Sequence, residues 1–184
     1  MNNDNEIYIG GVEKRDITIV DYDPSWPDTF RSHAAAIFEA LGEANLRIEH
    51  IGSTAVPGLA SKPIIDILLV VENSGNEESY LPQMEEAGYE LLVREPDWHQ
   101  HRMFRTPERD VHIHVYSWGC PEIDRIILFR NQLRSSPNDR SRYEPTKRKL
   151  AEQSWECMDD YAKEKTEVVE SILTAASSES ENHS

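Results

Sequence analysis

Apolar residues recur along the chain in alternating and helical patterns, and Gly and Pro separate one pattern from the next. Alternating or continuous apolar runs predict six strands: Ile17–Val20, Arg47–Ile51, Ile64–Val71, Tyr89–Arg94, Arg102–Thr106 and Val111–Tyr116. Apolar positions at helical spacing predict five helices: Trp26–Leu41, Glu77–Ala87, Pro121–Arg134, Asp139–Ser154 and Met158–Ala176. This order predicts an α+β fold, in which helices cover a mixed β-sheet and the C-terminal third is helical.

The two ends of the chain carry little that could be buried. We expect residues 1–16 to form a frayed N-terminal segment, and residues 177–184, which are only Ser, Glu, Asn and His, to form a disordered tail. Residues 17–176 are expected to fold as a single domain, since a chain of 184 residues suits one hydrophobic core.

Composition excludes several classes of protein. The net charge of −15 argues against nonspecific nucleic-acid binding, which needs a cationic surface. The longest apolar run is interrupted by Asp66 and is too short to cross a membrane. Two cysteines do not form a disulfide framework, so we expect a cytoplasmic protein. The oligomeric state is not indicated by these features.

The charge is unevenly distributed along the sequence. The stretch from Ser117 to Leu150 has eight basic and four acidic side chains, a local charge of +4, so the rest of the chain carries −19. A basic segment in an acidic protein is suited to a small phosphorylated ligand. The alternative is a solvated helix surface with ion pairs between neighbouring turns.

The most informative loop follows the predicted strand Arg47–Ile51. Gly52 allows a ligand to approach the backbone closely, and Ser53 and Thr54 offer donors to phosphate oxygens. The next strand then carries Asp66 among apolar residues. Because burying a lone carboxylate is costly, Asp66 is expected to face a cation, a metal ion or a cleft.

The segment from His50 to Asp66, His-Ile-Gly-Ser-Thr-Ala-Val-Pro-Gly-Leu-Ala-Ser-Lys-Pro-Ile-Ile-Asp, resembles the signature of the GrpB family. Four further segments are similar to patterns of that family: Tyr22–Trp26, His112–Val115, Phe129–Arg134 and Tyr143–Lys147. The resemblance covers residues 17–175 and implies the nucleotidyltransferase (polymerase-β-like) fold.

The resemblance also implies a site. In that superfamily a Gly-Ser turn holds nucleotide phosphates, and paired acids on the next strand bind two Mg²⁺ ions for attack on the α-phosphorus. Gly52, Ser53 and Asp66 match this pattern, but Leu68 occupies the position of the second acid, on the same face as Asp66. A two-metal mechanism therefore does not carry over unchanged.

Two histidines offer a replacement for the missing acid. Alternation places His112 and His114 on one face of their strand. If that strand lies beside Asp66, the set of Asp66, His112 and His114 would bind one divalent ion, with Asp66 and His114 as its ligands, or one histidine would serve as general base. Because imidazole is a poor Mg²⁺ ligand, Mn²⁺ or Zn²⁺ would fit better than Mg²⁺. The alternative is that both are hydrogen-bonded strand residues. His50 is expected to be structural, with a role in supporting the site as the alternative. His99 and His101 flank a predicted turn and are expected to face solvent, but their clustering before Arg102 leaves a ligand role as the alternative.

Several basic side chains are candidates to neutralise phosphate charge, with ion pairs as the alternative for each: Lys62, Arg102, Arg130, Arg134 and Lys147. The sequence thus favours a nucleotidyltransferase-like protein that binds a nucleotide or a small phosphorylated ligand with a divalent metal ion. The alternative is a non-catalytic nucleotide- or partner-binding module that lost its second carboxylate at Leu68. A mononuclear metallohydrolase using Asp66 and the histidine pair is a third hypothesis.

Overall fold

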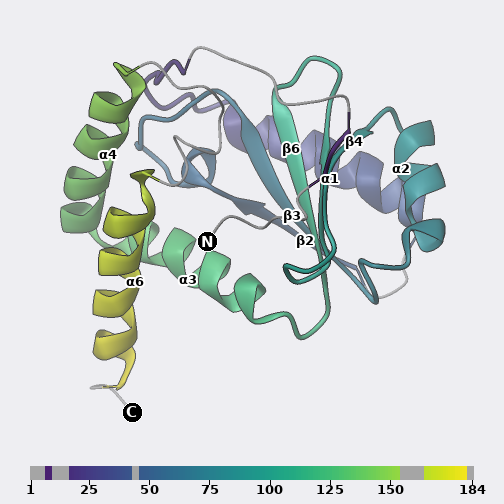
Figure 1. The fold of residues 1–184 in the computed structure, drawn as a ribbon. Helices are drawn as coiled ribbons and strands as arrows, with labels where there is room; N and C mark the ends of the chain where they lie inside the picture. Colours follow the sequence, from purple (N-terminus) through teal and green to yellow (C-terminus); the bar gives the residue numbers. More distant parts are fainter. Residues whose placement is uncertain (1–6, 10–16, 43–45, 154–163, 182–184) are drawn as a thin grey trace.

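A computed structural model describes residues 7–9, 17–42, 46–153 and 164–181 (Figure 1). Six strands are present in these ranges: β1 (Ile7–Tyr8), β2 (Arg47–Ile51), β3 (Ile65–Val71), β4 (Glu90–Glu95), β5 (His101–Arg105) and β6 (Val111–Ser117). The longer helices are α1 (Trp26–Leu41), α2 (Leu81–Glu86), α3 (Pro121–Ser135), α4 (Pro137–Ala151) and α6 (Thr166–Glu181). Short 3-10 turns lie at η1 (Ser53–Ala55) and η2 (Glu77–Ser79).

The strands form one mixed sheet in the order β1-β4-β5-β6-β3-β2. Strands β3 and β6 are parallel, and the other neighbouring pairs are antiparallel. The β3–β6 register pairs Asp66 with His112 and Leu68 with His114. The predicted α+β class with a mixed sheet is therefore confirmed, and so is the expectation that the histidine strand lies beside Asp66.

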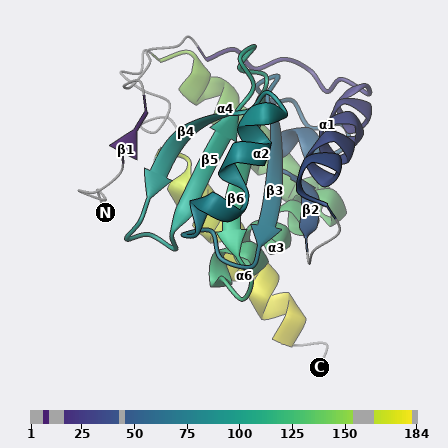
Figure 2. The same ribbon diagram turned by 90° about the vertical axis from the view of Figure 1, so that its right-hand side faces the viewer.

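Alternation along β3 separates two faces of the sheet. Ile65, Ile67 and the odd-numbered residues that follow pack into a core with α1 and α2. Leu68 and Val70 face the other side, where they pack with Ile123 of α3. Figures 1 and 2 show α1 and α2 on one side of the sheet and α3, α4 and α6 on the other.

The three C-terminal helices have a core of their own. The loop after η1 contributes Val56 and Leu59 to this core. The helices contribute Leu133 of α3, Tyr143 of α4 and Ile172 of α6. This packing holds the helical C-terminal third against the β2–β3 loop. No helix in the described ranges has the length and apolar character needed to cross a membrane.

Helix α1 begins and ends where the sequence predicts. Pro27 lies in its first turn, where a missing N–H costs nothing, and Asp28 favours the positive end of the helix dipole. The helix ends at Gly42, whose N–H donates to the carbonyl of Phe38 and whose φ of 75° suits glycine.

Three expectations differ from the structure. Ile17–Val20 is not a sheet strand, because Val20 makes only an isolated bridge to Ser61. Within the segment expected to be frayed, residues 7 and 8 form β1, which pairs with β4. The expected disordered tail also differs, since residues 177–181 continue α6. A helix anchored by buried residues such as Ile172 extends at little cost into polar residues. The predicted helix start at Met158 lies outside the described residues.

Candidate functional site

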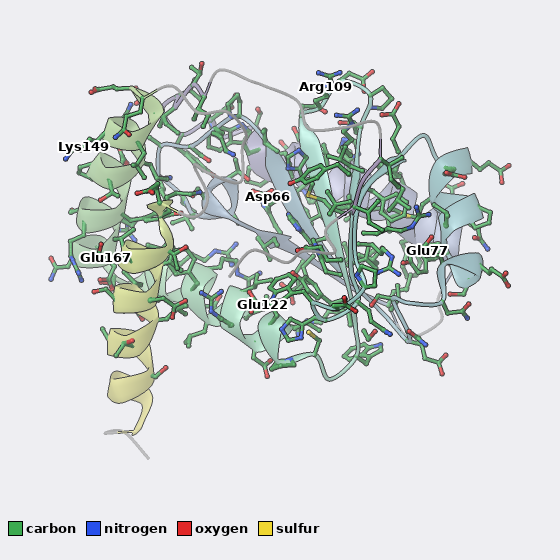
Figure 3. The ribbon with its side chains drawn as sticks, in the orientation of Figure 1. Asp66, Glu77, Arg109, Glu122, Lys149 and Glu167 are labelled. Carbon is green, nitrogen blue, oxygen red and sulfur yellow. The ribbon has the colours of Figure 1, made fainter. Side chains whose placement is uncertain are left out.

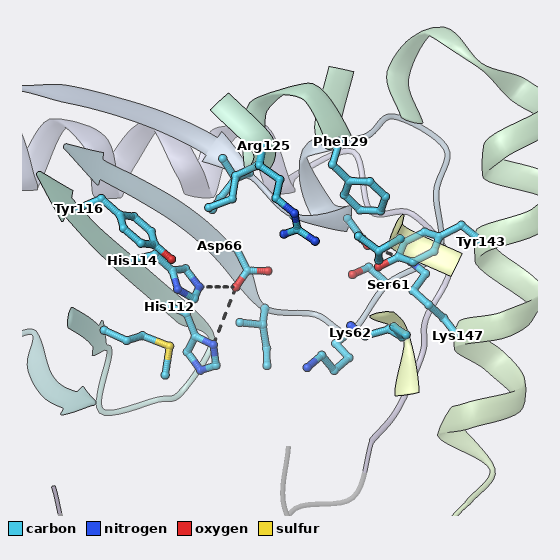
Figure 4. Close-up of a pocket in the computed structure, with 18 residues that line it drawn as sticks. Ser61, Lys62, Asp66, His112, His114, Tyr116, Arg125, Phe129, Tyr143 and Lys147 are labelled. Carbon is cyan, nitrogen blue, oxygen red and sulfur yellow. Dashed lines mark hydrogen bonds and ion pairs between the residues drawn. The ribbon is translucent and has the colours of Figure 1, made fainter. Parts of the chain in front are cut away.

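A cavity of about 380 Å³ lies between the Asp66 face of the sheet and the C-terminal helices (Figure 4). This volume is in the range of small-molecule sites. Figure 3 shows Asp66 inside the molecule, between sheet and helices, whereas Lys149 and Glu167 lie on the outer side of α4 and α6. The cavity brings together many of the residues predicted from the sequence: Gly52, Ser53, Lys62, Asp66, His112, His114 and Lys147.

Asp66 is the centre of this group. Its Oδ1 lies 3.5 Å from Nε2 of His114 and 3.8 Å from Nδ1 of His112. Burial alone would raise the pKa of Asp66, but the neighbouring His114, His112 and Lys62 hold it below its usual value. The carboxylate is therefore ionised at neutral pH and attracts a cation.

Gly52 is in direct contact with this carboxylate. It has φ 69° and ψ −172°, a conformation nearly restricted to glycine. A Cβ atom at Gly52 would lie 2.5 Å from Oδ2 of Asp66. Because Ile51 pairs with Asp66 across β2 and β3, the sheet register itself brings the glycine turn to the acid. The turn and the carboxylate thus form one unit.

Lys147 of α4 approaches the same turn from the opposite side. Its buried Nζ donates to Oγ of Ser53 at 3.0 Å and to the carbonyl of Ala60 at 2.5 Å. It also lies 4.8 Å from the centre of the Tyr143 ring. Burial lowers the pKa of Lys147 to about 7. This lysine is therefore poised to gain charge when an anion binds beside it.

The low pKa of Lys147 makes stability depend on pH. Between about pH 7 and pH 10 the unfolded chain binds more protons at this residue than the folded chain, so the free energy of unfolding rises with pH there. Between pH 7 and 9 we expect the free energy of unfolding of the wild type to rise with pH more steeply than that of Lys147→Met, by at most about 1.4 kcal/mol per pH unit. Urea unfolding at several pH values measures it. Lys149→Met, at an exposed position of the same helix, is the control, and equal slopes in all three proteins would contradict the prediction.

Two predicted phosphate ligands lie elsewhere. Arg102 is buried, and its Nε donates to Oε1 of Glu77. Arg130 is also buried and donates to Oε2 of Glu49 and to the carbonyl of His50. Neither arginine lines the cavity beside Asp66, and both form the ion pairs that the sequence offered as the alternative. Each buried guanidinium is used by an internal carboxylate, because leaving it without a partner would be costly.

Thr54 and Arg134 form hydrogen bonds that stabilise the β2–β3 loop on the side away from the cavity. The Thr54 hydroxyl is bonded to Nε2 of His50 at 3.0 Å and donates to the carbonyl of Ile64. Arg134 donates to the carbonyl of Ala55 at 2.8 Å. Neither residue lines the cavity, so the prediction that they contact phosphate is corrected. The expected structural role of His50 agrees with its buried position.

Sequence reasoning missed several residues of the cavity wall, including two cations and Tyr143. Lys165 lines the cavity, and burial lowers its pKa to about 8. Arg125 lines it too and forms ion pairs with Glu122 and Glu170. Tyr143 completes the wall. Arg125 lies in the basic segment and Tyr143 begins a family motif, so both had a signal, whereas no pattern distinguishes Lys165.

His101 was expected to face solvent, and this is wrong. It is 5% exposed, and its Nε2 lies 3.2 Å from Nδ1 of His114. Its Nδ1 lies 2.6 Å from Oε2 of Glu95. Burial lowers the pKa of His101 to about 4, although the hydrogen bond with Glu95 opposes this shift. His101 therefore contacts His114, which lines the cavity, through the ring nitrogen of His114 that is turned away from Asp66.

The donor set suits a metal ion only in part. Among the described residues, no three His, Cys, Asp or Glu side chains converge closely enough to hold an ion by themselves. A carboxylate together with an imidazole fits Mn²⁺ or Zn²⁺ better than Mg²⁺, for which imidazole is a poor ligand, and phosphate oxygens and water would complete the shell of the ion. Asp66 would supply the carboxylate and His114 one further donor.

Comparisons with known proteins agree with this fold. A family model described as GrpB protein matches residues 16–175. The chain is 46% identical over 173 residues to the UPF0157 protein BH1888 of Halalkalibacterium halodurans, covering 93% of this chain and 89% of that protein. The crystal structure of the conserved protein GrpB from Enterococcus faecalis has a TM-score of 0.76 at 35% identity, over 86% of this chain and 96% of that chain.

A more distant likeness extends beyond this family. A mutant of the Cid1 poly(U) polymerase bound to MgATP has a TM-score of 0.50 at 11% identity, over 73% of this chain and 44% of that chain. At that identity the likeness shows the fold alone. The chain therefore belongs to the GrpB family and has the nucleotidyltransferase-like fold that its sequence predicts.

Proposed function

We propose that the chain binds a nucleotide or a small phosphorylated ligand, together with a divalent metal ion, in the cavity beside Asp66. The charge of the cavity wall carries this proposal. In a chain with net charge −15, the described wall has three lysines, Lys62, Lys147 and Lys165, against one carboxylate, and its arginine, Arg125, is paired with Glu122 and Glu170. Figure 4 shows Lys62, Arg125 and Lys147 around the same space as Asp66. Such a focused positive field favours an anion of limited size.

The Gly52–Ser53 turn is the proposed phosphate contact. The Ser53 hydroxyl is already held by Lys147, and both line the cavity. A phosphate oxygen that approached Ser53 would meet the Lys147 ammonium group at once, since their polar atoms are 3.0 Å apart. Charge-assisted hydrogen bonds of this kind are about twice as strong as neutral ones.

In this proposal Asp66 and His114 hold the metal ion, which would neutralise charge on the phosphates when bound. The other histidine, His112, would accept a proton from the attacking hydroxyl group of an acceptor. The acceptor oxygen would form a bond to the α-phosphorus while the bond to pyrophosphate breaks. In this proposal Asp66 holds the ion that offsets the phosphate charge and lies beside the histidine that accepts the proton.

Calorimetric titration with ATP, GTP, CTP and UTP, each with Mn²⁺ or Mg²⁺, tests the proposal. We expect binding in wild type and a loss of about tenfold to hundredfold in affinity in Asp66→Asn and in Lys147→Met, because each removes a charged contact. Lys149→Met, at an exposed site two residues away, should bind like wild type. No heat with any of the four nucleotides and either metal would refute the proposal.

The second candidate function is a binding module without catalysis. It is favoured by Leu68, which is fully buried where the superfamily pattern has its second acid. The two functions differ in turnover, since only a transferase releases pyrophosphate. Nucleotide binding without pyrophosphate release over hours would favour the binding module.

A further inference from the structure

A chain of polar contacts leads from the end of the β4–β5 hairpin to the cavity. Glu95 and His101 pair across β4 and β5, and Oε2 of Glu95 lies 2.6 Å from Nδ1 of His101. Nε2 of His101 lies 3.2 Å from Nδ1 of His114. Nε2 of His114 then faces Oδ1 of Asp66 at 3.5 Å. Four side chains thus connect in sequence through both nitrogens of each ring.

Glu95 and His101 are shielded from water, whereas His114 and Asp66 are open to the cavity. The side chain of His101 is 7% exposed and that of Glu95 is 14% exposed, whereas His114 is 25% exposed and Asp66 31%. The His101 ring lies nearly parallel to the rings of Tyr116 and His114, with centroids at 4.8 and 5.3 Å. Rings packed in this way cannot rotate to exchange their nitrogens without disturbing the core.

The carboxylate sets the direction of the hydrogen bonds. An ionised carboxylate only accepts, so Nδ1 of His101 carries the proton that it donates to Glu95. In the singly protonated form of the ring, Nε2 of His101 therefore carries no proton. Its Nε2 is then an acceptor, and Nδ1 of His114 must be the donor across the 3.2 Å contact.

We infer that Glu95 and His101 are positioning residues, which fix the His114 tautomer with its proton on Nδ1 and its Nε2 lone pair facing Asp66. A lone pair and a carboxylate oxygen that face each other form a place for a cation and not for a further hydrogen bond. The inference rests on the proposed function, in which Asp66 and His114 take a divalent ion. The new element is that Glu95 and His101, which do not contact the ion themselves, select the tautomer of His114 that can bind it.

The hairpin turn is built to hold this arrangement. His99 and Gln100 have positive φ values of 55° and 51°, two consecutive strained positions outside glycine. Arg102 donates to the carbonyls of Gln100 and His101 from the other face of the sheet. Trp98 packs edge-on against the His101 ring. Such strain persists only where surrounding contacts impose it, which is typical of a functional position.

Long-range ¹H–¹⁵N NMR of the histidine rings tests the inference, at a pH where His114 carries one ring proton. We expect that proton on Nδ1 in wild type. In Glu95→Leu, His101 loses its acceptor and its tautomer is no longer fixed, so His114 should shift toward the Nε2-protonated form although Glu95 does not touch it. His101→Phe should give the same shift while keeping an aromatic ring in place. His99→Asn, in the same turn, is the control and should leave His114 unchanged.

Binding of Mn²⁺ alone provides the second measurement. We expect Glu95→Leu and His101→Phe to weaken it by about tenfold to hundredfold, as loss of such an outer partner does at other metal sites. An Nε2 proton on His114 in wild type, or an unchanged tautomer in a folded Glu95→Leu protein, would overturn the inference. Absence of Mn²⁺ binding to wild type, alone or with a nucleotide, would instead refute the proposed function, and the tautomer would still be decided by NMR.

Discussion

Replacing Leu68 by Asp is expected to unfold the protein and not to restore a second catalytic carboxylate. Leu68 is fully buried and packs with Val70, Tyr116 and Ile123 between the sheet and α3. The substitution removes apolar contacts worth about 2–5 kcal/mol and introduces a carboxylate that must either lose its charge or remain unsolvated. The sum is comparable to the whole stability of a domain of this size.

Circular dichroism and urea unfolding measure the effect. Leu68→Met, which conserves volume, is the matched control and should cost less than about 1.5 kcal/mol. A Leu68→Asp protein that unfolds at the wild-type urea concentration, and that releases pyrophosphate with a divalent metal ion, would contradict the expectation. It would also show that α3 can move away from the sheet.

Replacing Gly52 by Ala is expected to destabilise the fold and to disable the site together. The backbone conformation at Gly52 costs about 1–3 kcal/mol for any other residue. The added methyl group would also lie 2.5 Å from Oδ2 of Asp66. Either the carboxylate or the turn must shift, and both line the cavity.

Gly42 offers a control for the backbone effect alone. It has φ 75° and ψ −172°, almost the same conformation as Gly52, and a Cβ atom there would meet nothing within 4 Å. We expect Gly42→Ala to show the strain only and to keep wild-type Mn²⁺ binding. Gly52→Ala should be less stable than Gly42→Ala in urea and should lose Mn²⁺ binding. Equal stability and equal metal binding in the two variants would contradict the prediction, since they would show that a methyl group at position 52 does not displace Asp66.

The sequence predicts the centre of the site because period-2 alternation decides it. Spacing alone places His112 and His114 on one face of β6, and the apolar character of β3 indicates a central strand. The β3–β6 register then sets Asp66 beside His112. The placement of Gly52 follows from its position after β2, which precedes the turn back into β3. These are local properties of neighbouring residues.

The periphery of the site could not be predicted in this way. The sequence offers Arg102 and Arg130 as phosphate ligands or as members of ion pairs, and in the structure each is buried against a glutamate that is at least 25 positions away in sequence. His101 reads as a turn residue because its neighbours are polar. Its burial depends on Trp98 and Tyr116, which only the folded hairpin brings to it. Long-range pairing of polar side chains leaves no periodic pattern.

The β2–β3 loop has a consequence for how a ligand would be received. Residues that sequence reasoning assigned to the ligand, Thr54 and Arg134, instead bond to the loop itself, and Lys147 binds it at both Ser53 and Ala60. Ordering a mobile side chain on binding costs about 0.5–1.5 kcal/mol. Here that loss of entropy is incurred when the chain folds. An incoming anion would thus meet a rigid, preformed cradle, and its affinity would be limited by desolvation more than by reorganisation.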